Sequence, residues 1–71
     1  MITEIEYVFA SESQAYRFVN ELKHWALHEV KAKLNKRANQ VKVSYEFDGR
    51  GFDYTCSDLD GLASQYGGQE V

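Results

Sequence analysis

The sequence has almost none of the residues with which small domains build covalent or metal cross-links. It contains no proline and a single cysteine, Cys56, in 71 residues. One cysteine excludes an intramolecular disulfide, and the absence of cysteine pairs excludes the common zinc-binding frameworks. A chain of this length buries only about 60% of the surface that its unfolded form exposes. Its stability therefore has to come from packing of its aromatic residues or from association with a partner.

Long apolar runs and a recognisable leader are also missing. No stretch approaches the roughly 20 apolar residues that span a bilayer. Residues 1–6 lack the basic and apolar regions of a secretory signal. We therefore expect a cytoplasmic protein without a membrane partner. A single thiol suits a reducing compartment, and Cys56 is expected to be buried as a small hydrophobic residue rather than to react.

The overall charge is weakly negative, but the basic residues are not spread evenly. A net charge of −3 disfavours nonspecific binding of nucleic acid by the whole surface. One segment nevertheless has basic residues and no acidic ones. The residues of this basic run are Lys31, Lys33, Lys36, Arg37 and Lys42.

The clearest structural signal is alternation of apolar and polar residues on both sides of a turn. Residues 41–47 alternate, Asp48-Gly49-Arg50-Gly51 follows, and residues 52–56 alternate again. This pattern predicts an antiparallel hairpin with one buried face. The inward residues of that hairpin would be Val41, Val43, Tyr45, Phe47, Phe52, Tyr54 and Cys56.

Two further elements precede the predicted hairpin. Residues 3–9 alternate and predict a first strand. Ser11 and Gln14 have capping-box spacing, so a helix should begin near Glu12, and apolar residues at three- and four-residue steps continue it to about His28. Beyond that point two interpretations remain. Helix-favouring composition supports a helix through Leu34, which we prefer, whereas alternation over residues 29–34 supports an extended segment.

A second helix and a short tail complete the predicted domain. Ser57 is the expected N-cap, and Gly67-Gly68 ends the helix. Residues 69–71 are expected to be a disordered tail. Residues 1–68 then form a single α+β domain of order β-α-β-β-α, with helices on one face of a mostly antiparallel sheet. The opposite face would be mainly acidic and would carry Glu4, Glu6, Lys42, Ser44, Glu46, Asp53 and Thr55.

No residue pattern predicts catalysis, a cofactor or a small-molecule substrate. His24 and His28 are four residues apart within the predicted first helix and are of the type that binds zinc. They lack the HExxH pattern and an identifiable third ligand, so we expect no metal site. Ser, His and Asp residues are present without a nucleophile signature. We therefore expect that the protein is not an enzyme.

Two functions remain as hypotheses. The first is a non-enzymatic interaction or regulatory module that binds a protein partner or a second copy of itself, because uncovered sheet faces and edges invite association. Its candidate interface residues are Tyr16, Trp25, Glu46 and Asp53. The second is nucleic-acid binding through the basic run, although the aromatics that would stack on bases fall mostly on inward positions.

Overall fold

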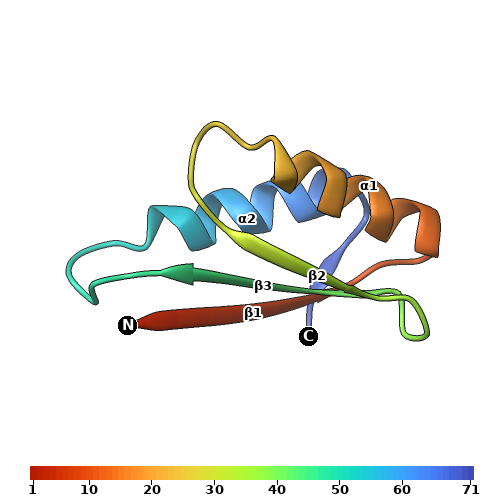
Figure 1. Ribbon diagram of the computed structural model, residues 1–71, viewed down its shortest axis with the longest axis horizontal. Helices are drawn as coiled ribbons and strands as arrows, with labels where there is room; N and C mark the ends of the chain where they lie inside the picture. The colour runs from red at the N-terminus through yellow and green to blue at the C-terminus, as the bar shows by residue number, and fades with distance from the viewer.

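Two helices lie side by side on one face of a four-stranded antiparallel sheet in the computed structural model, which describes residues 1–71 (Figure 1). The elements are β1 (Ile2–Val8), α1 (Glu12–Lys23), β2 (Lys31–Asn35), β3 (Gln40–Glu46), α2 (Tyr54–Gln65) and β4 (Gln69–Glu70). The strands follow the spatial order β2-β3-β1-β4. This order of elements and strands defines a ferredoxin-like, or split β-α-β, topology. The predicted α+β class, with helices on one face, is confirmed.

The first strand and the first helix begin close to where the sequence predicts them. In β1, Ile5 and Tyr7 are buried under the helices, whereas Glu4 lies on the opposite face. Ser11 is the N-cap of α1, and its hydroxyl oxygen accepts a hydrogen bond from the backbone N–H of Gln14 at 3.2 Å. The Gln14 side chain in turn accepts the Ser11 hydroxyl hydrogen at 3.0 Å. Ser11 therefore caps the helix as predicted, and its hydroxyl is held in place by the side chain of Gln14.

The preferred prediction of a helix through Leu34 is wrong. The last residue of α1 is Lys23, and the segment from Lys31 to Asn35 forms β2. In a longer helix, charged residues would lie on the apolar face that packs against the core. In an extended chain, Ala32 and Leu34 face the core instead. In that conformation these two residues pair with Val43 and Val41 of β3. Pairing of this segment with the distant strand β3 therefore outweighs its local helix propensity.

The predicted hairpin over residues 41–56 is also wrong in its second strand. β3 pairs with β1 on one side and with β2 on the other, so neither edge of β3 is free for residues 52–56. Those residues form the end of a loop and the first turn of α2 instead. Phe52 and Tyr54, predicted to point inward, are 63% and 69% exposed. The hairpin that does form joins β2 to β3 through a turn in which Asn39 has a positive φ of 52°.

The N-cap of the second helix lies four residues before the predicted cap. Asp53, rather than Ser57, is the N-cap of α2, and its carboxylate accepts the N–H of Cys56 at 2.9 Å. Two tyrosines of the sheet hold this helix. Tyr7 donates its hydroxyl hydrogen to Asp60 and Tyr45 donates to Asp53, both at 2.6 Å. The segment 52–56, predicted as a strand, therefore contains the N-cap and the first turn of α2.

The C-terminal residues form an edge strand instead of the expected disordered tail. Gly67 takes the left-handed conformation, with a φ of 78°, and Gly68 donates its N–H to the carbonyl of Ala63 at 2.8 Å. This glycine pair reverses the chain so that β4 pairs with Tyr7 and Val8 of β1. The backbone N–H of Val71 then donates to the carbonyl of Glu6 at 2.9 Å.

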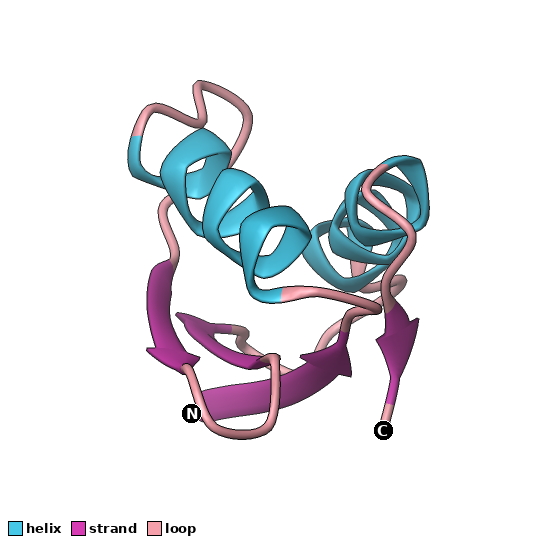
Figure 2. Ribbon diagram, turned by 90° about the vertical axis from the view of Figure 1, so that its right-hand side faces the viewer, coloured by secondary structure: helices cyan, strands magenta, loops and turns pink.

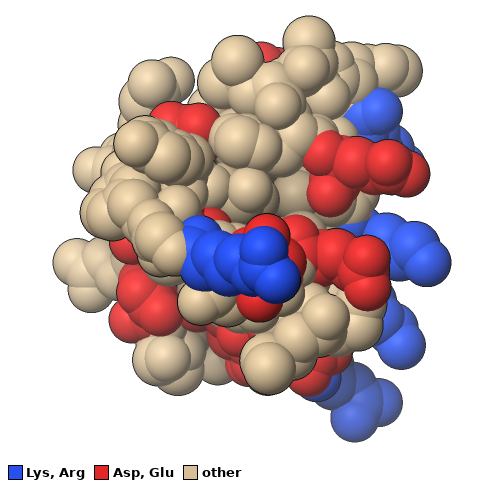
Figure 3. All heavy atoms as spheres, turned by 90° about the vertical axis from the view of Figure 1, so that its left-hand side faces the viewer, with Lys and Arg blue, Asp and Glu red and all other residues tan.

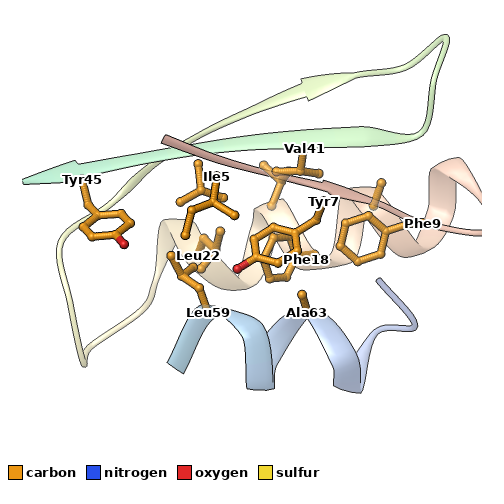
Figure 4. Packing of buried hydrophobic residues seen from close by; sticks show 12 residues of the cluster. Ile5, Tyr7, Phe9, Phe18, Leu22, Val41, Tyr45, Leu59 and Ala63 are labelled. Carbon is orange, nitrogen blue, oxygen red and sulfur yellow. The ribbon is translucent and has the colours of Figure 1, made fainter. Parts of the chain in front are cut away.

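The core lies between the sheet and the two helices (Figure 2, Figure 4). Twelve residues are buried, all of them apolar or aromatic. Phe18 of α1 lies at the centre and contacts the rings of Tyr7 and Phe9, with ring centroids 5.6 and 5.1 Å away. The buried residues are Ile5, Tyr7, Phe9, Ala15, Phe18, Val19, Leu22, Val41, Val43, Tyr45, Leu59 and Ala63. Because this core occupies one side of the sheet, the other side is left as a polar surface.

Candidate functional site

One face of the sheet is not covered by the helices (Figure 2). Alternate residues of each strand point away from the helices, so the register decides which side chains share this face. On β1 they are Ile2, Glu4, Glu6 and Val8, and on β3 they are Gln40, Lys42, Ser44 and Glu46. On β2 they are Lys31, Lys33 and Asn35, and on β4 Gln69 pairs with Val8.

Charges on this face are separated by sign. Lys33 of β2 lies beside Lys42 of β3, which in turn lies beside Glu6 of β1. In the next row, Lys31 pairs with Ser44, which pairs with Glu4. We call Lys31, Lys33 and Lys42 the basic half of the face and Glu4 and Glu6 the acidic half; a third acidic residue, Glu46, lies at the end of β3. The face was expected to be mainly acidic.

That expectation is wrong because two of its residues lie elsewhere and β2 adds lysines. Asp53 caps α2 and Thr55 lies in the first turn of that helix, so neither belongs to the sheet. Lys31 and Lys33 take their place on the face, since residues 31–35 form a strand. The errors over residues 29–34 and 52–56 therefore made the predicted face more acidic than the observed one.

The arrangement of these charges adds little net stability to the sheet, because attractive and repulsive pairs occur together. Lys33 and Lys42 are directly opposite each other, and like charges in that position are unfavourable. The ion pair on the face joins Lys42 Nζ to Glu4 Oε2 at 3.8 Å, with both side chains about half exposed. Such a pair is worth about 0–1 kcal/mol. Stability alone therefore does not account for grouping the lysines.

The structure brings all five residues of the basic run onto neighbouring segments. Lys36 and Arg37 lie in the turn between β2 and β3, at one end of the basic half. The backbone N–H of Arg37 donates to the Asn35 side chain at 3.2 Å, which holds the turn. In Figure 3, most of the Lys and Arg atoms in view lie along one side of the molecule, and one further group lies nearer the middle among acidic atoms. The basic run is thus a continuous surface feature that includes an edge strand.

The uncovered face has no aromatic side chain. The aromatic residues of the strands, Tyr7 and Tyr45, point to the helices, and Phe9 is buried just beyond β1. RNA-binding domains with a four-stranded sheet of this kind stack bases on exposed aromatics of the sheet face. This face can therefore contact an anionic backbone but cannot stack bases.

The four predicted interface residues do not form one surface. Tyr16 is 57% exposed on α1, whereas Trp25 packs against the core and its ring lies 5.2 Å from that of His28. Asp53 has a structural role as the cap of α2. Only Glu46 lies on the uncovered face, where its carboxylate is 4.0 Å from the N-terminal amine.

His28 makes contacts that the sequence does not predict. Its Nε2 is 2.7 Å from Asp58 Oδ2 and its Nδ1 is 3.1 Å from Thr55 Oγ1. Because α1 ends at Lys23, His24 and His28 do not share a helix face. No group of three or more His, Cys, Asp or Glu side chains is placed to hold a metal ion. His28 instead fastens the connection between α1 and β2 to the first turns of α2.

A polar groove lies at the end of the sheet where β3 extends beyond β2. Its volume is about 710 Å³, and only three of its nine lining residues are hydrophobic. The lining residues are Ile2, His28, Glu29, Val30, Lys31, Ser44, Tyr45, Glu46 and Thr55. Small-molecule sites of this size are mostly apolar and bury most of their ligand. The groove does not have that character.

The buried ionisable groups are held in their neutral forms. Burial raises the pKa of the Cys56 thiol, and the nearby carboxylates of Asp60 and Asp53 raise it further. Burial likewise raises the pKa of Tyr7 and of Tyr45, each of which also donates a hydrogen bond to a carboxylate. Cys56 is half-buried and protonated at neutral pH, which disfavours its use as a nucleophile.

Fold and surface together define a class: a small ferredoxin-like α+β domain with a charged, uncovered sheet face. No protein-family model, curated protein or solved structure matches the chain. Neither helix has the length and apolar character needed to cross a membrane. Because this topology supports many unrelated functions, the function of this chain has to be inferred from its surface residues.

Proposed function

We propose that this protein is a small cytoplasmic, non-enzymatic interaction module that binds a protein partner through its uncovered sheet face. The observation that carries the proposal is the separation of charge on that face. Lys33 and Lys42 are held side by side, and Glu4 and Glu6 occupy the neighbouring strand on the same face. An interspersed arrangement would be more favourable in the isolated sheet.

A face with separated charges is suited to recognition. Complementary potentials steer association and fix the orientation of a partner, and they do so with little apolar area. Ile2 and Val8 add apolar contacts beside the charges, and Ile2 is 62% exposed. The face is also built on strands, so its side chains are held in a fixed register rather than on a mobile loop.

Two charge-reversed variants test this proposal. Lys33→Glu changes the basic half, whereas Arg17→Glu makes the same charge change on the exposed side of α1. Affinity-tagged wild type and both variants are crosslinked in native extract of the source cells, and the captured proteins are identified by mass spectrometry. We expect partners held by wild type and Arg17→Glu to be lost with Lys33→Glu. The same set of partners with all three proteins would contradict the proposal.

Nucleic-acid binding is the second candidate, and the gathering of the basic run on β2, its turn and β3 favours it. Several adjacent cations can bind phosphates by releasing counterions, without reading bases. Duplex and single-stranded oligonucleotides at about 50 mM salt provide the test. Binding that falls steeply with salt and is lost in Lys33→Glu would support this function. No detectable binding at that salt would exclude it.

A further inference from the structure

We infer that the partner of the uncovered face is a second copy of this chain, bound in a two-fold dimer whose axis runs parallel to the strands. The inference rests on the proposed function, because it names the partner for the same face. Two sheets that pack face to face keep their strands within about 30° of each other, at a separation of about 10 Å. The register of this sheet decides how the charges would meet.

A row is a set of residues that are cross-strand partners on the face. Rotation about an axis parallel to the strands reverses the left-to-right order of the strands, but each row stays at the same height along them. β3 of one copy then faces β1 of the other, because these two strands are central in the order β2-β3-β1-β4. Lys42 therefore faces Glu6 of the second copy, since these two residues share a row. By the same rule Ser44 faces Glu4, Gln40 faces Val8 and Glu46 faces Ile2. No pair of like charges is placed in direct opposition.

The other two-fold arrangement is unfavourable. An axis across the strands would place β2 on β2 and β1 on β1, with the rows reversed. Lys31 would then face Lys33 of the second copy, and Glu4 would face Glu6, because each pair occupies adjacent rows of one strand. Like charges in opposition cost binding energy and suppress that orientation. The face therefore selects a single orientation by charge.

The charge balance of the face also favours contact between two copies. The chain has 8 basic and 11 acidic residues, for a net charge of −3. Basic and acidic residues are equal in number on the face, so the whole net charge lies on the rest of the surface. The residues concerned are Lys31, Lys33, Lys42, Glu4, Glu6 and Glu46. Two copies that meet through this neutral face therefore bring no excess of like charge together.

The size of the face sets the expected strength of the dimer. Four strands about 4.8 Å apart and about 20 Å long give roughly 400 Å² per copy, about half of what a standard interface buries per partner. A polar interface of this size is transient. We expect a dissociation constant on the order of 0.1–1 mM at low salt, weakened severalfold at about 0.5 M salt.

Mixing two variants tests the orientation. In Lys42→Glu and in Glu6→Lys, like charges face each other across the proposed dimer, so each variant alone should be monomeric by sedimentation velocity. When the two are mixed, the introduced glutamate of one copy faces the introduced lysine of the other, and the unchanged Lys42 and Glu6 face each other at the second contact. A heterodimer should then form with affinity near that of the wild type.

The mixing experiment separates contact between copies from effects within one chain. Each substitution also disturbs its own sheet, because Lys42 and Glu6 are neighbours within one chain. Mixing cannot repair that internal effect, so recovery of the dimer reports contact between copies. Two variants that stay monomeric when mixed, although both are folded, would contradict the proposed orientation.

A measurement on the unmodified protein covers the case in which a variant does not fold. Equal amounts of ¹⁵N-labelled and unlabelled wild-type protein are mixed and treated with a zero-length carbodiimide. The total concentration is about 1 mM, the upper end of the expected dissociation constant. This reagent joins amines to carboxylates that are in contact. Mixed-label peptides joining Lys42 to Glu6 are expected at low salt and are reduced at about 0.5 M salt.

Monomeric wild type at this concentration, or absence of the mixed-label crosslink, would overturn the dimer. The proposed function is tested separately by the capture experiment. If the partners are other proteins, Lys33→Glu should still fail to capture them. If a short oligonucleotide dissociates the dimer, the basic half also binds nucleic acid. If no mixed-label crosslink forms at any salt concentration, self-association is contradicted, but binding of another protein is not.

Discussion

Two tyrosine hydroxyls connect the sheet to the second helix. Tyr7 of β1 reaches Asp60, and Tyr45 of β3 reaches Asp53, which also caps α2. α2 buries only Leu59 and Ala63, so it depends on such anchors more than α1 does. Each tyrosine buries its ring in the core and places its oxygen at the boundary, a use for which tyrosine is well suited.

Removing either hydroxyl should loosen α2. Tyr7→Phe and Tyr45→Phe each lose a hydrogen bond to a carboxylate, and we expect each to lower the free energy of unfolding by about 1–2 kcal/mol. Urea unfolding followed by circular dichroism measures the change. Tyr16→Phe, on the exposed side of α1, should leave stability within about 0.5 kcal/mol of wild type. Equal effects at all three positions would contradict the anchoring role.

The same hydroxyls should make stability fall in alkaline solution. Burial raises the pKa of Tyr7 and of Tyr45, and their carboxylate partners raise it further. An unfolded tyrosine ionises near a pH of about 10, so above that pH the unfolded state loses protons that the folded state retains. The contribution of these groups is complete below about pH 10 and is lost as the pH rises toward the folded values. Urea unfolding between about pH 8 and about pH 11 should show this loss, and it should be smaller in the Tyr7→Phe/Tyr45→Phe double variant.

At the scale of elements, local signals identified the start of the first helix and the chain reversal after the second, but the cap that they indicated at Ser57 was wrong. Ser11 as a cap and Gly67-Gly68 as a helix end could be predicted, because their geometry depends on neighbouring residues alone. Residues 31–35 and 52–56 both alternate, and only the first forms a strand. β3 has two edges, which β1 and β2 occupy. Competition for those edges is nonlocal, so alternation could not decide it.

Two glycines associated with α2 should respond oppositely to alanine. A Cβ at Gly68 would lie 2.4 Å from the Phe9 ring, whereas one at Gly61 would meet nothing within 4 Å. We expect Gly68→Ala to destabilise the protein by about 1–3 kcal/mol and to weaken β4, because Phe9 must move. Gly61→Ala should stabilise it by up to about 1 kcal/mol through helix propensity. Thermal unfolding of both variants measures the difference, and a stabilising Gly68→Ala would contradict the tight packing of the chain reversal.

At the scale of the molecule, the sequence predicts the two-layer arrangement and the existence of an uncovered face, but it does not predict the charge of that face. Lys42, Glu4 and Glu6 could be assigned to the face from strand alternation alone. Lys31 and Lys33 could not, since their placement requires β2 to pair with β3. The contacts that His28 makes with α2 could not be predicted either, because they join residues 27 and 30 positions apart.

Grouping lysines on the face implies that stability and binding oppose each other there. Lys33→Glu replaces a repulsive cross-strand pair with Lys42 by an attractive one, so we expect the free energy of unfolding to rise by about 0.5 kcal/mol. The gain should disappear at about 1 M salt, where surface charges are screened. Lys31→Glu is the matched control, because Lys31 is opposite the uncharged Ser44 and its change should be smaller. Urea unfolding at low and high salt measures both. A Lys33→Glu protein that is less stable than wild type would show that the lysine pair supports the sheet, and would contradict the proposal that the pair is kept for binding.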